Sequence, residues 1–108
     1  LKKKHIENSR INKNQNIYIM KAVVFYEHNT DKTMDEFMAV FPRHEVLEEE
    51  FIKSGKVLGT GAFGNPGEGA MAIFINKEAA EEFVNGDPFV QEGLIAKVTI
   101  REWNDELA

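Results

Sequence analysis

Residues 56–75 read KVLGTGAFGNPGEGAMAIFI, and this stretch decides between two folds. Within it, GTGAFG matches the G-x-G-x-x-G pattern of a dinucleotide-binding loop, which works only where a helix follows the last glycine directly. Here the turn sequence NPGEG follows Gly64, and the apolar run AMAIFI comes after the turn. The stretch therefore predicts two strands joined by a hairpin, and it argues against a nucleotide site.

Strand and helix patterns continue on both sides of this hairpin. Thr33 and Glu36 form a capping box at the start of a helical pattern, and Pro42 is expected to break that pattern into two helices. Gly55 is expected to end the second helix, and Asn76 to cap the next one. The predicted elements are strand 20–28, helices 34–41 and 42–54, strands 56–63 and 70–75, helix 77–86, a loop over 87–94 and strand 95–103.

The order of these elements is β-α-β-β-α-β, in which the broken helical region counts as the first α. This order predicts an α+β fold of the ferredoxin-like kind, an antiparallel sheet with its helices on one face. The first and third strands lie in the middle of such a sheet, and both are apolar on their two faces. Because an apolar face of this size is rarely left in water, the uncovered face predicts a homodimer that packs sheet against sheet.

Length, charge and composition set further bounds. The chain has 108 residues, no cysteine and a net charge of −5, which suit one domain without disulfides or thiolate chemistry. Residues 1–19 are basic, so the remainder is acidic and is not expected to bind nucleic acid. No apolar run is long enough for a signal peptide or a membrane span, so we expect a cytoplasmic protein without membrane contact. Residues 1–16 are expected to be a disordered basic extension, and residues 17–108 a single domain.

Three side chains are candidates for chemistry, and each has a structural alternative. His44 lies at the edge of the apolar stripe that contains Leu47 and Phe51, where a histidine is either a structural residue or a proton carrier. Glu48, four residues later, would make a metal pair with His44, but a third ligand would have to come from elsewhere. Glu48 also belongs to a solvated acidic run of the helix, so no metal site is predicted. Asp87 precedes a proline, and it is either a turn former or the carboxylate that orients His44.

From Met20 to Trp103 the sequence resembles the YCII-related (YciI-like) family of small dimeric α+β proteins. The residues that carry the resemblance are the pair Arg43-His44, followed by Leu47 and Gly55, then VLGTGAF, NKEAAEEF, Asp87-Pro88-Phe89 and EGLIAKVTIREW. One departure is Ala62, where the family often has proline. The resemblance implies that residues 17–108 form a single YCII-like domain of the dimeric α+β barrel type.

The resemblance also implies a site. His44 and Asp87 would form a catalytic dyad in a pocket between helix and sheet, with Arg43, Phe63 and Phe89 as substrate-binding residues and no cofactor or metal. One member of the family is associated with removing chloride from a chlorinated hydroxyquinol, which implies a dehydrochlorinase-like (lyase) or isomerase-like acid/base enzyme acting on an unknown small molecule. The alternative is a non-catalytic dimeric module that binds a small molecule or a partner, with the dyad as a structural hydrogen bond.

Overall fold

The computed structural model describes residues 11–12, 17–18 and 20–107. Two short strands, β1 (Ile11–Asn12) and β2 (Ile17–Tyr18), pair antiparallel with each other. Apart from β1, residues 1–16, the expected disordered extension, lie outside the described residues. The remaining elements are β3 (Lys21–His28), α2 (Met34–Lys53), β4 (Val57–Ala62), β5 (Ala70–Phe74), α3 (Lys77–Gly86), α4 (Pro88–Gln91) and β6 (Ile95–Trp103).

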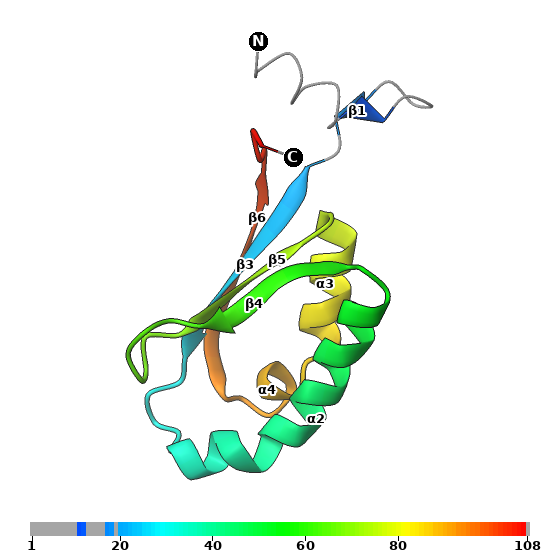
Figure 1. Ribbon diagram of the computed structural model, residues 1–108. Helices are drawn as coiled ribbons and strands as arrows, with labels where there is room; N and C mark the ends of the chain where they lie inside the picture. The colour runs from blue at the N-terminus through cyan, green and yellow to red at the C-terminus, as the bar shows by residue number, and fades with distance from the viewer. Residues whose placement is uncertain (1–10, 13–16, 19, 108) are drawn as a thin grey trace.

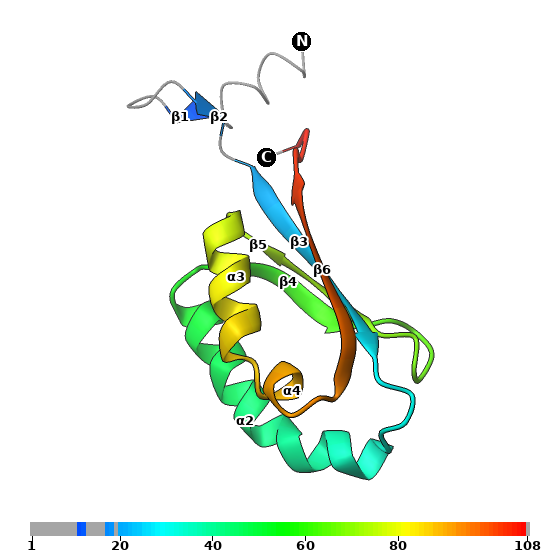
Figure 2. The ribbon, with the colours of Figure 1, turned by 180° about the vertical axis from the view of Figure 1, so that it is seen from behind.

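A four-stranded antiparallel sheet forms the body of the molecule, with strand order β4-β5-β3-β6. The two central strands, β5 and β3, are paired from Ala22 opposite Phe74 to Tyr26 opposite Ala70. Helices α2 and α3 lie on one face of this sheet, and no described element covers the other face (Figure 1, Figure 2). The predicted ferredoxin-like βαββαβ fold is therefore confirmed, with the two strands that are apolar on both faces in the middle.

Three phenylalanine rings pack helices α2 and α3 against the sheet. Phe51 of α2 meets Phe83 of α3 edge-on, with ring centroids 5.1 Å apart, and Phe74 of β5 lies 5.2 Å from Phe83 and 6.2 Å from Phe51. Phe74 and Phe83 are fully buried, beside Val24 of β3. Burial of each such ring contributes about 1.5–3 kcal/mol. The cluster fixes α2 over the sheet, and with it the side chains on the inner face of that helix.

The helical region before the hairpin is a single helix, α2, so the expected break at Pro42 is wrong. A proline inside a helix removes one backbone donor and crowds the preceding turn, which bends the helix without having to end it. Figure 1 shows this bend, where the N-terminal turns of α2 change direction relative to the rest. Val40 and His44, on either side of Pro42, are both buried, and their packing offsets the cost of the proline. The expected capping box of Thr33 and Glu36 is present.

A second difference lies between α3 and β6, where a loop was expected over 87–94. This segment contains the short helix α4, which begins at Pro88. Proline suits the first turn of a helix because its φ is already helical and its missing N–H would have no partner there. Asp87 ends α3 and caps α4, and its carboxylate accepts the Phe89 amide at 3.0 Å. The junction of the two helices thus holds the Asp87 side chain in one place.

Gly69, just before β5, sets how closely the hairpin approaches β3. Its φ is +94°, in the left-handed region, and a Cβ at this position would stand 2.1 Å from the carbonyl oxygen of Tyr26. Only glycine is compatible with both conditions. The close approach holds the start of β5 against Tyr26.

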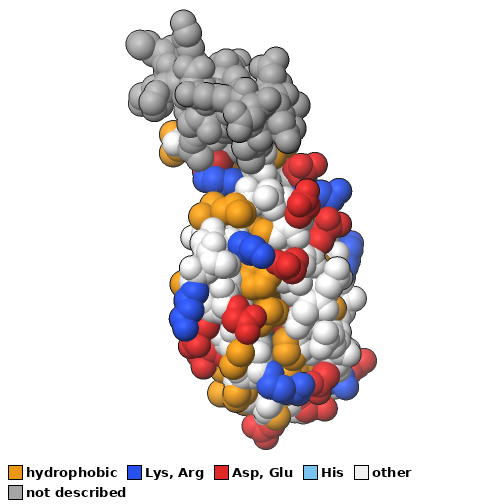
Figure 3. Space-filling view, turned by 90° about the vertical axis from the view of Figure 1, so that its right-hand side faces the viewer, with side chains coloured by type: hydrophobic (Ala, Val, Ile, Leu, Met, Phe, Trp, Pro, Cys, Tyr) orange, Lys and Arg blue, Asp and Glu red, His pale blue; other side chains and the backbone are white. Residues whose placement is uncertain are grey.

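The outer surface of the helices mixes charges of both signs. Figure 3 shows Lys and Arg side chains interspersed with Asp and Glu, and hydrophobic side chains between them, on the helix side of the molecule. Within residues 20–107, no helix combines the length and the apolar character needed to cross a bilayer.

Candidate active site

A cavity of about 580 Å³ lies between α2 and the sheet. A volume of this size suits a small molecule. Its apolar wall comes mainly from the N-terminal half of α2 and from α4, and includes Met34, Phe37, Met38, Phe41 and Phe89. Its polar wall comes mainly from β3, α2, β4 and the α3–α4 junction, and includes Tyr26, His44, Glu48, Thr60 and Asp87.

His44 and Asp87 make a buried hydrogen bond of 2.8 Å between Nδ1 and Oδ1. The same Oδ1 accepts the Phe89 amide, so it is an acceptor, and the assigned tautomer has Nδ1 donating its proton to it. This arrangement leaves Nε2 as the ring atom that can exchange a proton with a ligand. Asp87 is fully buried and His44 nearly so, which shields the hydrogen bond from bulk water.

A second carboxylate faces the other nitrogen of the ring. Glu48, one turn after His44, places Oε2 3.4 Å from Nε2, and Thr60 of β4 donates its hydroxyl to that oxygen at 3.3 Å. Burial lowers the pKa of His44, but the hydrogen bond and charge of Asp87, together with those of Glu48, outweigh burial and raise the pKa above its usual value. His44 therefore keeps both protons to a higher pH than a free imidazole, and it can release one at Nε2.

Tyr26 brings a phenol to the same cluster from β3. Its side chain is buried, and its hydroxyl makes no hydrogen bond with any residue that the structure describes. Burial, then the charge of Asp87 and the approach of the hydroxyl to the Asp87 carboxylate, and last the charge of Glu48, raise the pKa of Tyr26 above its ordinary value. The phenol therefore stays protonated and serves as a neutral hydrogen-bonding group.

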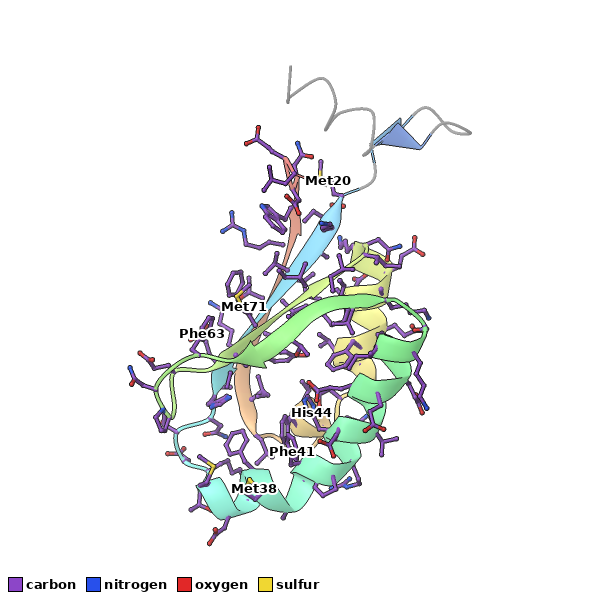
Figure 4. The ribbon with its side chains drawn as sticks, viewed as in Figure 1. Met20, Met38, Phe41, His44, Phe63 and Met71 are labelled. Carbon is purple, nitrogen blue, oxygen red and sulfur yellow. The ribbon has the colours of Figure 1, made fainter. Side chains whose placement is uncertain are left out.

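The structure brings together three of the residues expected at the site. His44 and Asp87 are hydrogen-bonded, and the ring of Phe89 packs against the imidazole. Phe83 of the core meets the imidazole edge-on at 6.0 Å, so aromatic rings hold it on two sides. His44 and Phe41 both project from the inner side of α2 toward the sheet (Figure 4).

The other two expected residues, Arg43 and Phe63, lie elsewhere. The guanidinium of Arg43 is more than half exposed and pairs with Glu92, outside the lining of the cavity. Phe63 follows β4 and lies on the uncovered side of the sheet, the side that also carries Met71 (Figure 4). Neither side chain shares the cavity with His44 in one chain.

Several polar residues of the cavity were not expected as site residues, and among them Tyr26, Glu48 and Thr60 belong to the polar cluster around His44. Glu48 had a signal, since its spacing from His44 places both side chains on one face of α2. Tyr26 had a weaker one, because alternation along β3 puts it on the same face as the buried Val24. Thr60 had no signal in the sequence, because its contact with Glu48 depends on where β4 meets α2.

The pair of His44 and Glu48 does not extend to a metal site. Among the described residues, no three His, Asp or Glu side chains converge in a way that could hold a metal ion. Asp87 is the third carboxylate or imidazole group of the cluster, but it binds the opposite nitrogen of His44. The two carboxylates therefore flank the ring and act on its two protons.

Comparisons with known proteins give a family and a fold. The profile of the YCII-related domain matches residues 20–104. The chain is similar in structure to 5-chloro-2-hydroxyhydroquinone dehydrochlorinase from Burkholderia phenoliruptrix AC1100, solved in complex with 2,5-dihydroxybenzoquinone, with a TM-score of 0.64 and 18% identity over 78% of this chain and 93% of that one. A conserved protein from Methanosarcina mazei Go1 gives a TM-score of 0.49 and 18% identity over 79% of this chain and 91% of that one. No curated protein matches the sequence significantly.

Proposed function

The chain belongs to the YCII-related family, and from this premise we propose that it is an enzyme that transfers protons on a small molecule. His44 is the general acid or base, and Asp87 orients it. The proposed ligand class is a hydroxylated six-membered ring of the size of 2,5-dihydroxybenzoquinone, which the dehydrochlorinase of similar fold binds. The cavity's aromatic wall and polar wall suit such a ring.

The observation that carries the proposal is the 2.8 Å hydrogen bond from His44 Nδ1 to Asp87 Oδ1 at the edge of a cavity. A carboxylate in this position holds the imidazole in one tautomer and stabilises its protonated form. Proton transfer by a positioned imidazole then takes place at Nε2. These are the properties that an acid/base enzyme requires of its histidine.

Glu48 fits the same role as a second proton carrier. The distance of 3.4 Å from its Oε2 to His44 Nε2 is longer than the about 2.7–2.9 Å of a strong charge-assisted hydrogen bond. The contact between the two groups is therefore weak, so Glu48 can turn toward a ligand oxygen while Asp87 and Phe89 hold the imidazole in place. A proton that leaves the ligand can reside on either of them before it returns.

The test measures chloride release from 5-chloro-2-hydroxyhydroquinone and binding of 2,5-dihydroxybenzoquinone by absorbance. We expect His44→Gln to lower the rate by about 10²–10⁴-fold, the usual contribution of a general acid or base, while quinone binding changes little. Glu45→Gln, on the exposed side of α2, is the matched control and should leave the rate unchanged. An unchanged rate in folded His44→Gln refutes the acid/base role, and native protein that neither binds nor turns over these compounds refutes the ligand class.

A non-catalytic small-molecule-binding module is the second candidate, and one observation favours it. Asp87 is fully buried and caps α4, so its hydrogen bond to His44 has a structural use without any chemistry. In that case the native protein binds its ligand without turnover, and His44→Gln lowers stability while binding is kept.

The proposed working unit is a homodimer that closes the uncovered face of the sheet. Phe25 and Met71 are paired across β3 and β5 on that face, and Phe25 is 37% exposed. At Gly59 and Gly61 of β4, an added Cβ would meet nothing within 4 Å. The centre of this face is thus apolar, and the face has no side chains at the two glycines of β4, which favours close approach of a second copy.

A further inference from the structure

Two buried polar atoms beside the dyad lack a partner. One is the hydroxyl of Tyr26, and the other is Oδ2 of Asp87; neither makes a hydrogen bond with any described residue, and both are closed off from solvent. Leaving such a group unpaired costs about 1–3 kcal/mol, so two in one site require an explanation. The hydroxyl can rotate to donate and the carboxylate oxygen can only accept, so the two needs are complementary.

Neighbouring groups restrict the positions of both Asp87 Oδ2 and the Tyr26 hydroxyl. Asp87 Oδ1 already accepts from His44 Nδ1 at 2.8 Å and from the Phe89 amide at 3.0 Å, which fixes the carboxylate plane and the direction of Oδ2. Gly69 packs against the Tyr26 carbonyl and holds β3 in place. Tyr26 and Asp87 line the same cavity, and after burial the charge of Asp87 and the approach of the hydroxyl to its carboxylate raise the pKa of Tyr26.

We propose that Tyr26 is a positioning residue, whose side chain shifts slightly so that its hydroxyl donates to Asp87 Oδ2 and completes a chain from Tyr26 through Asp87 to His44. This second anchor stabilises the charge of Asp87 and weakens its hold on the proton of His44. Without it, Asp87 would bind that proton more strongly, and Nε2 would release its own proton only at a higher pH. The catalytic consequence rests on the proposed function, but the hydrogen bond does not.

Other charged groups also face His44 and must be kept constant in a test. Glu48 on α2 adds to the effect of Asp87 on the pKa of His44. Lys32, in the turn after β3, lines the same cavity and opposes further positive charge. His28 at the end of β3 also lines it, but burial lowers its pKa, so it adds positive charge only at low pH. Removal of one hydroxyl from Tyr26 leaves all these groups in place. A change in the pKa of His44 then reports the hydrogen bond between Tyr26 and Asp87.

The experiment is an NMR titration of the His44 ring in the full, ligand-free chain. We expect Tyr26→Phe to raise the pKa of His44 by about half a pH unit or more, as expected when a hydrogen bond to a carboxylate is lost. Tyr18→Phe is the matched control, because Tyr18 is the other of the two tyrosines and lies outside the matched residues 20–104. It should leave the pKa unchanged. An unchanged or lowered pKa in folded Tyr26→Phe overturns the proposal.

A second variant keeps the ring and changes only the strength of the donor. Fluorotyrosine at position 26 is the stronger acid and donates more strongly, so the pKa of His44 should fall; a rise or no change overturns the proposal. Both titrations use ligand-free protein, so the test of the hydrogen bond does not depend on whether the protein catalyses a reaction. Where turnover is found, the acid limb of kcat/KM in Tyr26→Phe should move to higher pH with the pKa of His44.

Discussion

The imidazole of His44 lies nearly flat on the ring of Phe89, with centroids 4.2 Å apart and planes inclined by 19°. The amide of the same Phe89 donates to Asp87 Oδ1, so one residue holds both members of the dyad. Phe37 of α2 packs edge-on against Phe89 in turn, with centroids 5.5 Å apart. One face of the imidazole is therefore closed to ligands, and its edge at Nε2 is the part that they can reach.

Replacement of Asp87 should separate its two roles. Asp87→Ala removes the cap of α4 and the partner of His44, and we expect it to lower the free energy of unfolding by about 3–5 kcal/mol, as for other broken buried pairs. Asp87→Asn keeps the cap, so it should cost less stability, yet it should abolish activity because an amide can hold the imidazole in the wrong tautomer. Urea unfolding beside the chloride assay checks both. Equal loss of stability in the two variants would contradict the capping role, and Asp35→Ala, exposed on α2, is the control.

Stability should fall as the pH rises through the pKa of His44. That pKa lies above 6.5 in the folded chain, so the native state binds the proton more tightly than the unfolded state does. The resulting stabilisation is complete below pH 6.5 and is lost as the pH rises through the raised value. Urea unfolding from below pH 6.5 to well above it measures this loss.

Two histidine variants control the pH experiment. His44→Gln should remove the loss of stability at higher pH. His28→Gln should keep that loss, because burial lowers the pKa of His28 and its contribution has the opposite sign. A native protein whose stability does not change over this range would contradict the raised pKa of His44.

A charge on the uncovered face of the sheet should separate the proposed dimer. Met71→Glu places a carboxylate at the centre of that face, where it would lose its hydration on association. Light scattering at micromolar concentration should give twice the chain mass for the native protein and the mass of one chain for the variant. Ile52→Glu, 59% exposed on the helix side, is the control and should stay dimeric. A native protein with the mass of one chain would rule out the dimer.

Gly69 should tolerate no side chain. Gly69→Ala adds a Cβ that overlaps the Tyr26 carbonyl at a positive φ, and the strained backbone alone costs about 1–3 kcal/mol. We expect a larger loss in urea unfolding, since either β3 or the hairpin must move. Gly64→Ala is the control, because a Cβ there meets nothing within 4 Å. Similar stability of the two variants would show that the contact with Tyr26 can relax.

Local patterns in the sequence predicted the four strands of the sheet and α3 well. The last strand has the predicted bounds, residues 95–103, and Asn76 caps α3 as expected. The break at Pro42 was predicted from the proline alone, because packing on both sides of a bend has no local signature. Helix α4 was missed because four residues are too few to show a helical period.

The sequence predicted those site residues that belong to recognisable motifs. His44, Asp87 and Phe89 belong to short segments that the family resemblance singled out, and the structure brings them together. Glu48 was assigned to a solvated acidic face, because helical periodicity gives an angle around the axis but not the opening of a cavity there. Tyr26 meets the dyad only through the pairing of distant strands, which a single sequence does not specify.

Asp87 ends one helix, begins another and holds a histidine, so its loss would harm folding before it harmed chemistry. A protein of this fold without the proposed proton transfer would still need the aspartate to build its scaffold. His44 is under no such demand, since any side chain that donates a hydrogen bond could satisfy the carboxylate. We therefore expect the aspartate to be needed wherever this scaffold is built, and the histidine to be needed only where the proposed proton transfer takes place.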